Sequence, residues 1–229
     1  MNNLLIFGIN DFAEILYENI KAGNAMQDYV VRGFILDDEY CDAESCYGEA
    51  IYPYSAIENL FSKEDTEILL CLGYKKMNEA RKNIFGRLSE AGWRIASYYD
   101  RRSTIQAQAM GAGNIVLEET NIGIRCVVGN GNVFYPKSLL GHHSSVGDFN
   151  FFSSFSAVAG HVNIGNRCFF GIHSSTKDKI SVADETLLGA ACHADRDIRK
   201  RGLVFAASPC QSVNNRSEAM AKYILNHCL

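Results

Sequence analysis

A six-residue repeat runs through the second half of this chain. When every sixth residue is read from Val116 to Leu188, twelve of the thirteen positions are apolar, and glycine often follows them. An α-helix repeats about every 3.6 residues and a strand roughly every two, so neither explains the spacing. A six-residue repeat is typical of a parallel β-helix, in which three short faces form one coil and the coils stack. The pattern predicts a β-helix over residues 100–229, with a bulge or loop at the polar position Thr176 and an end to the repeat near Leu188.

Histidines gather at one place in this repeat. Three repeats make one coil, so residues eighteen positions apart stack in a column about 4.8 Å from one another. His143 and His161 have this separation, and His142 lies beside them at a turn after Gly141. Because an unperturbed imidazole titrates near neutral pH, the group predicts an acid/base site, with Asp148 close enough in sequence to orient a histidine. Ordinary turn histidines and a solvated turn carboxylate are the alternatives that the sequence leaves open.

The spacing of these histidines does not predict a metal site. A zinc site of three histidines needs one pair close in sequence on a common face, and positions 142/143, 161 and 173 do not give that arrangement. The eight cysteines include no CxxC pair, so we interpret them as small buried thiols in a reducing compartment. We therefore expect no metal.

The first half of the chain alternates apolar runs with helical patterns. Residues 3–7 form a continuous apolar run that ends at Gly8, as a buried strand does. Further runs of this kind are separated by segments with helical spacing of apolar residues. This alternation predicts an α/β domain over residues 1–99, Rossmann-like, with a parallel sheet. The expected strands are 3–7, 29–36, 67–73 and 94–99, and the expected helices are 11–20, 55–61 and 75–91.

A parallel sheet binds ligands at the carboxyl ends of its strands, where helix N-termini offer N–H groups. In this chain that edge would hold Gly8, Asn10, Asp37, Asp38 and Gly73. The glycine-rich dinucleotide fingerprint is incomplete, since Asn10 stands where a second glycine is expected, so a mononucleotide or a nucleotide-sugar fits better. Carboxylates at the end of the second strand are suited to accept hydrogen bonds from a ribose or a base. The alternative is a domain that serves only for packing.

Composition and charge exclude several classes of function. A formal net charge of −4 argues against a general nucleic-acid surface. The N-terminus lacks the basic region of a signal peptide, and no segment reaches the roughly 20 apolar residues of a transmembrane helix, so we expect a cytoplasmic protein. The basic stretch 196–201 could meet the phosphates of coenzyme A or be a solvated loop. Residues 217–225 are expected to form a helix that caps the β-helix.

Three segments resemble a known family. They are the strand end Gly33-Phe-Ile-Leu-Asp-Asp, the run Ser138-Leu-Leu-Gly-His-His-Ser-Ser-Val-Gly-Asp-Phe, and the run Gly160-His-Val-Asn-Ile-Gly-Asn-Arg-Cys-Phe-Phe-Gly-Ile-His-Ser-Ser. With them, almost the whole chain resembles the bacterial NeuD/PglD-like sugar acyltransferases. The resemblance implies a left-handed β-helix, a homotrimer with each active site between neighbouring β-helices, and acetyl-CoA as the acyl donor.

The resemblance also implies roles for individual residues. His142 matches the general base, and His143 and Asp148 could assist it. Positions that match the acetyl-CoA site are Gly160, Ile172 and Ala190, and positions that match the nucleotide-sugar pocket are Gly8, Asn10, Asp37, Asp38 and Gly73. The chain departs from the family where His143 replaces an acidic residue and Phe151 replaces a second histidine.

We therefore expect an acetyl-CoA-dependent N-acetyltransferase that acts on a nucleotide-linked amino-sugar in surface-glycan biosynthesis. Two alternatives stay open: O-acetylation of a sugar of the sialic-acid type, and a non-catalytic β-helix scaffold. The adjacent histidines beside Gly141 favour an enzyme over a scaffold.

Overall fold

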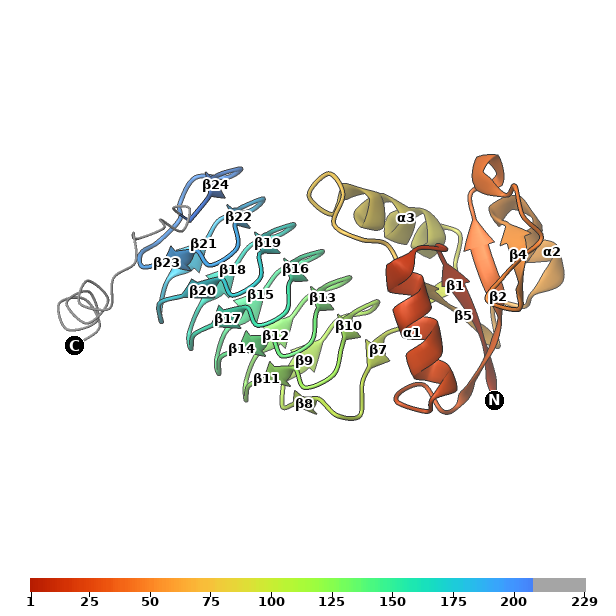
Figure 1. Cartoon of the computed structure of the whole chain (residues 1–229), viewed down its shortest axis with the longest axis horizontal. Helices are drawn as coiled ribbons and strands as arrows, with labels where there is room; N and C mark the ends of the chain where they lie inside the picture. Colours follow the sequence, from red (N-terminus) through yellow and green to blue (C-terminus); the bar gives the residue numbers. More distant parts are fainter. Residues whose placement is uncertain (208–229) are drawn as a thin grey trace, which may run out of the picture.

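The computed structural model describes residues 1–207, which form two parts along the longest axis of the molecule (Figure 1). An α/β unit holds the N-terminal residues, and coils of short strands stack away from it (Figure 1). The helix expected over residues 217–225 lies outside the described residues. Within the described part, no helix has the length and apolar character needed to cross a membrane.

The N-terminal unit is a six-stranded sheet in the order β3-β4-β2-β1-β5-β6. Every pairing is parallel except that of β3 with β4. Strands β2, β3 and β4 lie on one side of β1, and β5 and β6 lie on the other. The strands are β1 (Asn2–Phe7), β2 (Tyr29–Leu36), β3 (Ser45–Cys46), β4 (Glu49–Pro53), β5 (Thr66–Leu70) and β6 (Arg94–Ile95). The helices are α1 (Asp11–Lys21), α2 (Ile57–Leu60) and α3 (Glu79–Glu90), with short 3-10 helices at Asp38–Tyr40 and Tyr54–Ala56.

The central strand β1 is buried on both faces, as its continuous apolar run predicts. Leu4 and Ile6 pack in a cluster with residues of α1, whereas Leu5 and Phe7 pack in a cluster with Leu88 of α3. Successive side chains of a strand point to opposite faces, so one apolar run serves two cores. The α1 side of this core continues into the coils, because Phe151 belongs to the same cluster.

The second part is a parallel β-helix with three sheets, which fits a left-handed β-helix. Sheet I has the order β24-β22-β19-β16-β13-β10-β7, sheet II has β23-β20-β17-β14-β11-β8, and sheet III has β21-β18-β15-β12-β9. The strands of sheet I are β7 (Tyr98–Tyr99), β10 (Ile115–Val116), β13 (Val133–Phe134), β16 (Phe151–Phe152), β19 (Phe169–Phe170), β22 (Leu187–Leu188) and β24 (Val204–Phe205). Those of sheet II are β8 (Thr104–Ile105), β11 (Asn121–Ile122), β14 (Leu139–Leu140), β17 (Ala157–Val158), β20 (Ser175–Thr176) and β23 (His193–Ala194). Those of sheet III are β9 (Ala109–Met110), β12 (Val127–Val128), β15 (Ser145–Val146), β18 (Asn163–Ile164) and β21 (Ser181–Val182).

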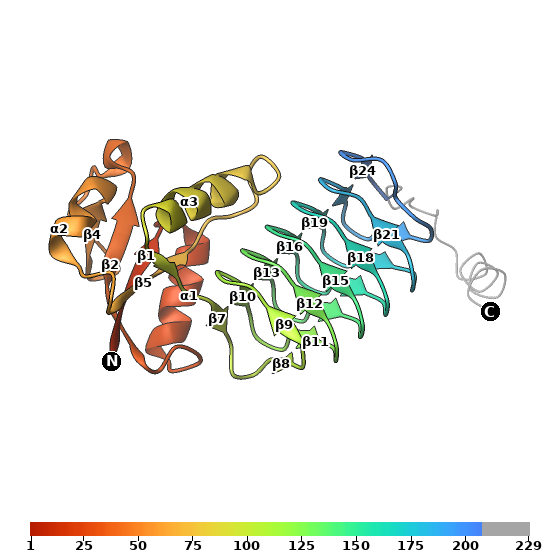
Figure 2. The same ribbon diagram turned by 180° about the vertical axis from the view of Figure 1, so that it is seen from behind.

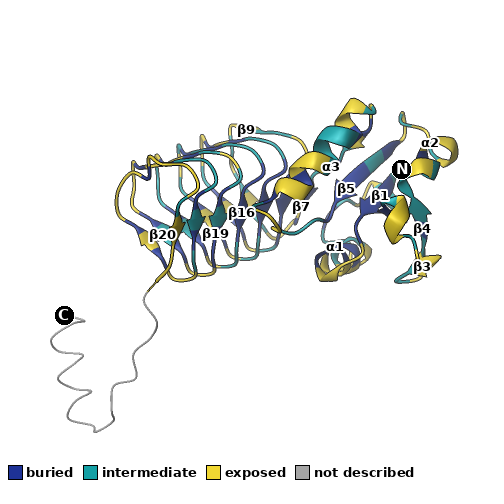
Figure 3. Ribbon diagram, turned by 90° about the horizontal axis from the view of Figure 1, so that it is seen from above, coloured by how far each residue is buried: buried dark blue, intermediate teal, exposed yellow. Residues whose placement is uncertain are grey.

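The repeat predicts the interior of the coils correctly. The apolar positions point inward, and the rings of Phe134, Phe152 and Phe170 stack with centroids 4.5 and 4.7 Å apart. Exposed residues lie mainly on the turns between strands (Figure 3). Most of these turns hold a residue with positive φ at every sixth position, among them His143 and His161. Buried cysteines fill some of the inner positions, where the thiols of Cys126 and Cys168 donate to carbonyl oxygens at 3.1 and 3.3 Å.

The structure corrects three expectations about this repeat. Thr176 forms no bulge: it is buried in β20 and pairs with Ala194, and its Oγ1 accepts a hydrogen bond from the Ala159 N–H at 3.1 Å. The coils do not end near Leu188, because β23 and β24 extend them. The expected strand 94–99 is two strands, of which β6 pairs with β5 and β7 pairs with β10. The chain therefore crosses from one part to the other between Ile95 and Tyr98.

Arg81 of α3 joins the two parts. Its side chain is fully buried, and its Nε donates to the Gly131 carbonyl oxygen at 2.8 Å. Its Nη1 donates to the carbonyl of Leu72 at 3.0 Å and its Nη2 to that of Asn150 at 3.1 Å. Burial lowers the pKa of Arg81 to about 9. The start of α3 and the β-helix lie on the same side of the sheet in the view from behind (Figure 2).

Replacement of Arg81 by methionine is expected to lower the free energy of unfolding by about 3 kcal/mol. Methionine fills much of the volume but leaves the carbonyls of Gly131 and Asn150 buried without donors. Urea unfolding, followed by circular dichroism, measures the change. The control is Arg199→Met, an exposed site at which a change within about 0.5 kcal/mol is expected. Equal losses in the two variants would contradict the role given to Arg81.

Candidate functional site

Three histidines meet where sheet II turns into sheet III, a place we call the histidine corner. His142 and His143 lie in the turn between β14 and β15, and His161 lies one coil further, between β17 and β18. The His161 N–H donates to the His142 carbonyl oxygen at 2.9 Å, which fixes the two turns against each other. His143 and His161 have φ values of 60° and 58°, so both hold the left-handed conformation of the corner.

The three imidazole rings are in mutual contact. The rings of His143 and His161 stack with centroids 4.8 Å apart and planes at 16°, as the eighteen-residue separation predicts. The His142 ring stands perpendicular to them, and its Nδ1 lies 3.0 Å from the Nδ1 of His143. One nitrogen of this pair must donate and the other accept, so the contact sets the tautomers of both rings.

The pKa of His143 is lowered, first by its partial loss of solvent and then by the neighbouring His161. His142 and Arg125 act in the same direction. A lowered pKa favours the neutral imidazole, which keeps one ring nitrogen free to accept a hydrogen bond.

A hollow of about 510 Å³ lies beside His142. Its lining residues are Gln106, Asn121, Gly123, Ile124, Leu139, Leu140, Gly141, His142, Val158, Ala159 and Gly160. Gly160 is required here because the His142 ring lies against its Cα. A Cβ at this position would be 2.8 Å from Cε1 and 2.9 Å from Nε2 of that ring. The glycine therefore lets the ring lie flat along the edge of the hollow.

Asp148, which the sequence places near the histidines, is not part of the histidine corner. It lies at the next corner, between β15 and β16, and its Oδ1 accepts a hydrogen bond from the Asn130 N–H at 2.6 Å. Its own N–H donates to Asn166 Oδ1 at 2.7 Å. The carboxylate fastens one coil to the next, so the expectation that it orients a histidine is wrong.

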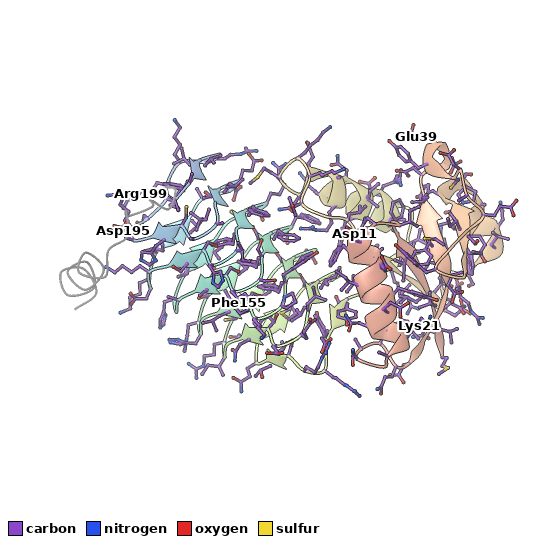
Figure 4. The ribbon with its side chains drawn as sticks, in the orientation of Figure 1. Asp11, Lys21, Glu39, Phe155, Asp195 and Arg199 are labelled. Carbon is purple, nitrogen blue, oxygen red and sulfur yellow. The ribbon has the colours of Figure 1, made fainter. Side chains whose placement is uncertain are left out.

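A second hollow, of about 530 Å³, lies between the N-terminal sheet and the coils; we call it the edge hollow. It is lined by Asn10, Asp11, Phe12, Leu72, Gly73, Tyr74, Lys75, Ala80, Tyr135 and Phe151. Tyr74 and Tyr135 both pack on Phe151, with ring centroids 5.0 and 4.9 Å away. Asn10 caps α1 by accepting from the Phe12 and Ala13 N–H groups. Asp11 marks the start of that helix, on the side that faces the coils (Figure 4).

The acidic pair from the second strand lines a different pocket, of about 430 Å³, with Tyr54 and Arg87. Asp37 forms an ion pair with Arg87, and Asp38 Oδ1 accepts from the Ser55 N–H at 3.0 Å. The hydrogen bonds from Ser55 lower the pKa of Asp38. Glu39, which follows the pair, lies at the rim of the N-terminal unit away from the coils (Figure 4).

The residues predicted to bind substrate are therefore divided among different places. Asn10 and Gly73 line the edge hollow, whereas Asp37 and Asp38 line the acidic pocket. Gly8 lines neither of them, and a Cβ there would lie 2.8 Å from the Cys71 carbonyl oxygen. Sequence reasoning missed Tyr135, which the coils contribute to the edge hollow. Tyr74 directly follows Gly73 at the end of a buried strand, the edge at which ligand-binding residues were expected.

The residues predicted to bind acetyl-CoA also lie at different corners. Gly160 belongs to the histidine corner, whereas Ile172 and Ala190 lie where sheet I turns into sheet II. The Ala191 N–H donates to the Ile172 carbonyl oxygen at 2.9 Å, so these two turns stack. Phe155 and His173 stack on the outside of this second corner, where Figure 4 labels Phe155. Asp195 and Arg199 mark the last described coils (Figure 4).

Comparison with solved structures finds the same fold in sugar acetyltransferases. The acetyltransferase domain of PglB from Neisseria gonorrhoeae FA1090 has a TM-score of 0.78 and 18% identity, over 93% of this chain and 100% of that one. Perosamine N-acetyltransferase from Caulobacter crescentus, with one histidine replaced by asparagine and in complex with CoA and GDP-perosamine, has a TM-score of 0.78 and 16% identity, over 89% of this chain and 93% of that one. WeeI from Acinetobacter baumannii AYE has a TM-score of 0.74 and 14% identity, over 91% of this chain and 98% of that one.

The PglB domain was also solved with acetyl coenzyme A. No family model matches this chain, and no curated protein matches it by sequence. The solved neighbours are of the NeuD/PglD-like type that the sequence motifs resemble. At the level of its fold, the chain is similar to these sugar acetyltransferases.

Proposed function

We propose that this protein is an acetyl-CoA-dependent N-acetyltransferase that acts on a nucleotide-linked amino-sugar in surface-glycan biosynthesis. The observation that carries the proposal is the tautomer-setting contact of 3.0 Å between the Nδ1 atoms of His142 and His143 beside an open hollow. Neighbours with this fold hold acetyl coenzyme A in one case and CoA with GDP-perosamine in another. The fold alone does not decide a function, so the argument rests on the geometry of the site.

His142 acts as the general base. When its Nδ1–H donates to the neutral His143, the lone pair of its Nε2 is free, and this atom lies on the Gly160 side of the ring. The sugar amine attacks the thioester carbonyl while Nε2 takes its proton, and a C–N bond forms as the C–S bond breaks. The departing thiolate then recovers the proton from His142. His143 holds the base in the required tautomer, in the place where the family has an acidic residue.

The edge hollow is suited to the nucleotide-sugar. It lies at the carboxyl edge of β1 and β5, where the strand order reverses, which is the usual ligand site of a Rossmann-like sheet. Tyr74 and Tyr135 offer ring faces, and Lys75 offers a charge for a diphosphate. Asp37 and Asp38 keep free lone pairs for a ribose or base beyond this hollow, since a carboxylate has about four acceptor sites.

One chain cannot bring the base and this sugar pocket together. The histidine corner joins sheets II and III, and it therefore lies opposite sheet I, whose outer face carries Phe151 of the edge hollow. A complete site needs the histidine corner of one copy and the edge hollow of another. We infer a homotrimer of left-handed β-helices, in which acetyl-CoA lies between Gly160 of one copy and the Ile172–Ala190 corner of its neighbour. Exposed apolar residues at both corners, Ile124 and Ile172, fit this contact.

Replacement of His142 by alanine is expected to lower kcat by about a hundredfold or more, because general-base catalysis contributes roughly that much. Acetyl-CoA affinity should stay within about threefold, since backbone groups and apolar side chains supply most contacts. Release of free thiol measures transfer, with amino-sugar and hydroxy-sugar nucleotides offered in parallel.

The matched control is His193→Ala, an exposed histidine of β23 whose Nδ1 lies 2.9 Å from Ser175 Oγ. The assignment of the base is wrong if H142A transfers acetyl groups at the rate of the H193A variant. Transfer to hydroxyl acceptors alone would favour the O-acetyltransferase, and absence of any CoA thioester binding would favour the scaffold.

Mixed trimers of H142A and Tyr74→Ala chains are expected to regain activity that each variant lacks alone. In the proposed trimer, each site takes His142 from one chain and Tyr74 from its neighbour. A site is therefore intact wherever His142 comes from a Y74A chain and Tyr74 comes from an H142A chain. Co-expression with two purification tags gives the mixed trimers, and the thiol assay compares them with each parent. Light scattering checks that the mixed assemblies have the mass of a trimer.

If mixing restores nothing although both variants form trimers, the site does not lie between copies. The trimer itself is rejected if light scattering finds a monomer.

A further inference from the structure

We propose that His142, His143 and His161 form a binding site for a divalent transition-metal ion, here Zn²⁺, and that the bound ion inhibits acetyl transfer. The inhibition rests on the proposed function, whereas binding of the ion does not. The spacing of these histidines along the chain argued against a metal site, and the fold overturns that argument. Stacking of one coil on the next brings a ligand nitrogen from each ring within 4.8 Å of the others.

The distances suit a single ion. Two imidazole nitrogens bound to tetrahedral zinc, each about 2.0–2.1 Å from it, lie about 3.3 Å apart. The two Nδ1 atoms of His142 and His143 are 3.0 Å apart, so a small rotation of either ring opens them to that distance. His161 stacks on His143 and stands perpendicular to His142. Because the lone pair of an imidazole nitrogen lies in the plane of its ring, His161 turns about its side-chain bonds to supply the third ligand from the next coil.

The surroundings leave room for the ion. His142 and His161 are exposed and His143 is partly buried, so water can occupy a fourth position. Imidazole is a ligand that zinc, copper and nickel prefer over magnesium or calcium. Arg125 and Lys179 flank the stack one coil before and one coil after it. Their positive charges weaken the binding of a dication, so the site should release zinc readily to EDTA.

Metal binding and base catalysis exclude each other at His142. In the proposed mechanism, Nδ1 carries the proton and Nε2 holds the free lone pair. An ion bound at Nδ1 takes the lone pair there and leaves the proton on Nε2, which then cannot accept another. Occupation of the site therefore removes the base without any change of fold.

The test compares His161→Asn with His173→Asn in the full chain. Both histidines sit at corner positions with φ near 57° (58° and 56°), a conformation that asparagine tolerates, so the two variants are matched for backbone effects. After treatment with EDTA and dialysis, Zn²⁺ is titrated against a chromophoric chelator, and Co²⁺ is added separately for its absorption spectrum. We expect wild type and H173N to bind equally and H161N to bind about tenfold more weakly or worse.

The proposal is overturned if H161N binds zinc as wild type does, or if H173N loses as much affinity. Circular dichroism confirms that each variant is folded. In the transfer assay, zinc should inhibit the wild type, EDTA should restore its activity, and H161N should resist the same zinc concentration.

The two proposals fail in different ways. If the protein transfers no acetyl group even in EDTA, the proposed function fails and the zinc titration still decides the site. If transfer proceeds and the titration shows no binding that depends on His161, the metal site fails and the proposed function stands.

Discussion

The placement of the N-terminal unit against the coils depends on how Arg81 is buried. Its guanidinium donates to carbonyls of the N-terminal unit and of two successive coils, Leu72 on one side and Gly131 and Asn150 on the other. A guanidinium without a carboxylate is costly to bury unless its donors are satisfied, so this arrangement tolerates little movement. Because Leu72 and Gly73 follow β5 and line the edge hollow, Arg81 also fixes that hollow against Phe151 of sheet I. The side chain of Arg81 thus helps to set the position of the edge hollow relative to the coils from outside that hollow.

Much of the fold follows from two periods in the sequence. The six-residue period predicts the coils, and the apolar run 3–7 with its neighbours predicts the parallel sheet, because in both cases periodic burial determines the backbone. Arg81 could not be predicted in this way, since a charged residue on an amphipathic helix ordinarily faces solvent. The bulge predicted at Thr176 was wrong for a related reason. A polar side chain fits an inner position when its hydroxyl accepts a hydrogen bond from a backbone N–H, and only the structure shows that partner.

In the candidate sites, too, the features that follow from the repeat were predictable, whereas those that depend on particular side-chain contacts were not. The stack of His143 on His161 follows from counting eighteen residues, so it was predictable from the sequence. The orientation of His142 was not, because it depends on the missing side chain of Gly160 one coil away. Asp148 lies away from the histidines because groups of the neighbouring coils engage it: its Oδ1 accepts from the Asn130 N–H, and its own N–H donates to Asn166 Oδ1. Closeness along the sequence does not show which hydrogen-bond donors lie nearest to a carboxylate in the fold.

Both uses proposed for the histidine corner depend on the spacing that the β-helix imposes on any residue at that position. Stacked coils set equivalent residues roughly 4.8 Å apart, a distance at which two neutral imidazoles can stack and two charged ones repel. Burial first, and then the neighbouring His161, lower the pKa of His143, which favours its neutral ring, and a neutral ring is both a base and a metal ligand. The protonation of His142 Nδ1 distinguishes these two uses. With its proton, Nδ1 donates a hydrogen bond to His143, and without it Nδ1 can bind an ion. A carboxylate in place of His143 would orient the same base, but it would exchange one of the three imidazoles for an oxygen ligand and remove the stack with His161. In the two proposals together, His143, which stands where the family has an acidic residue, is therefore the residue that couples catalysis at this corner to metal binding.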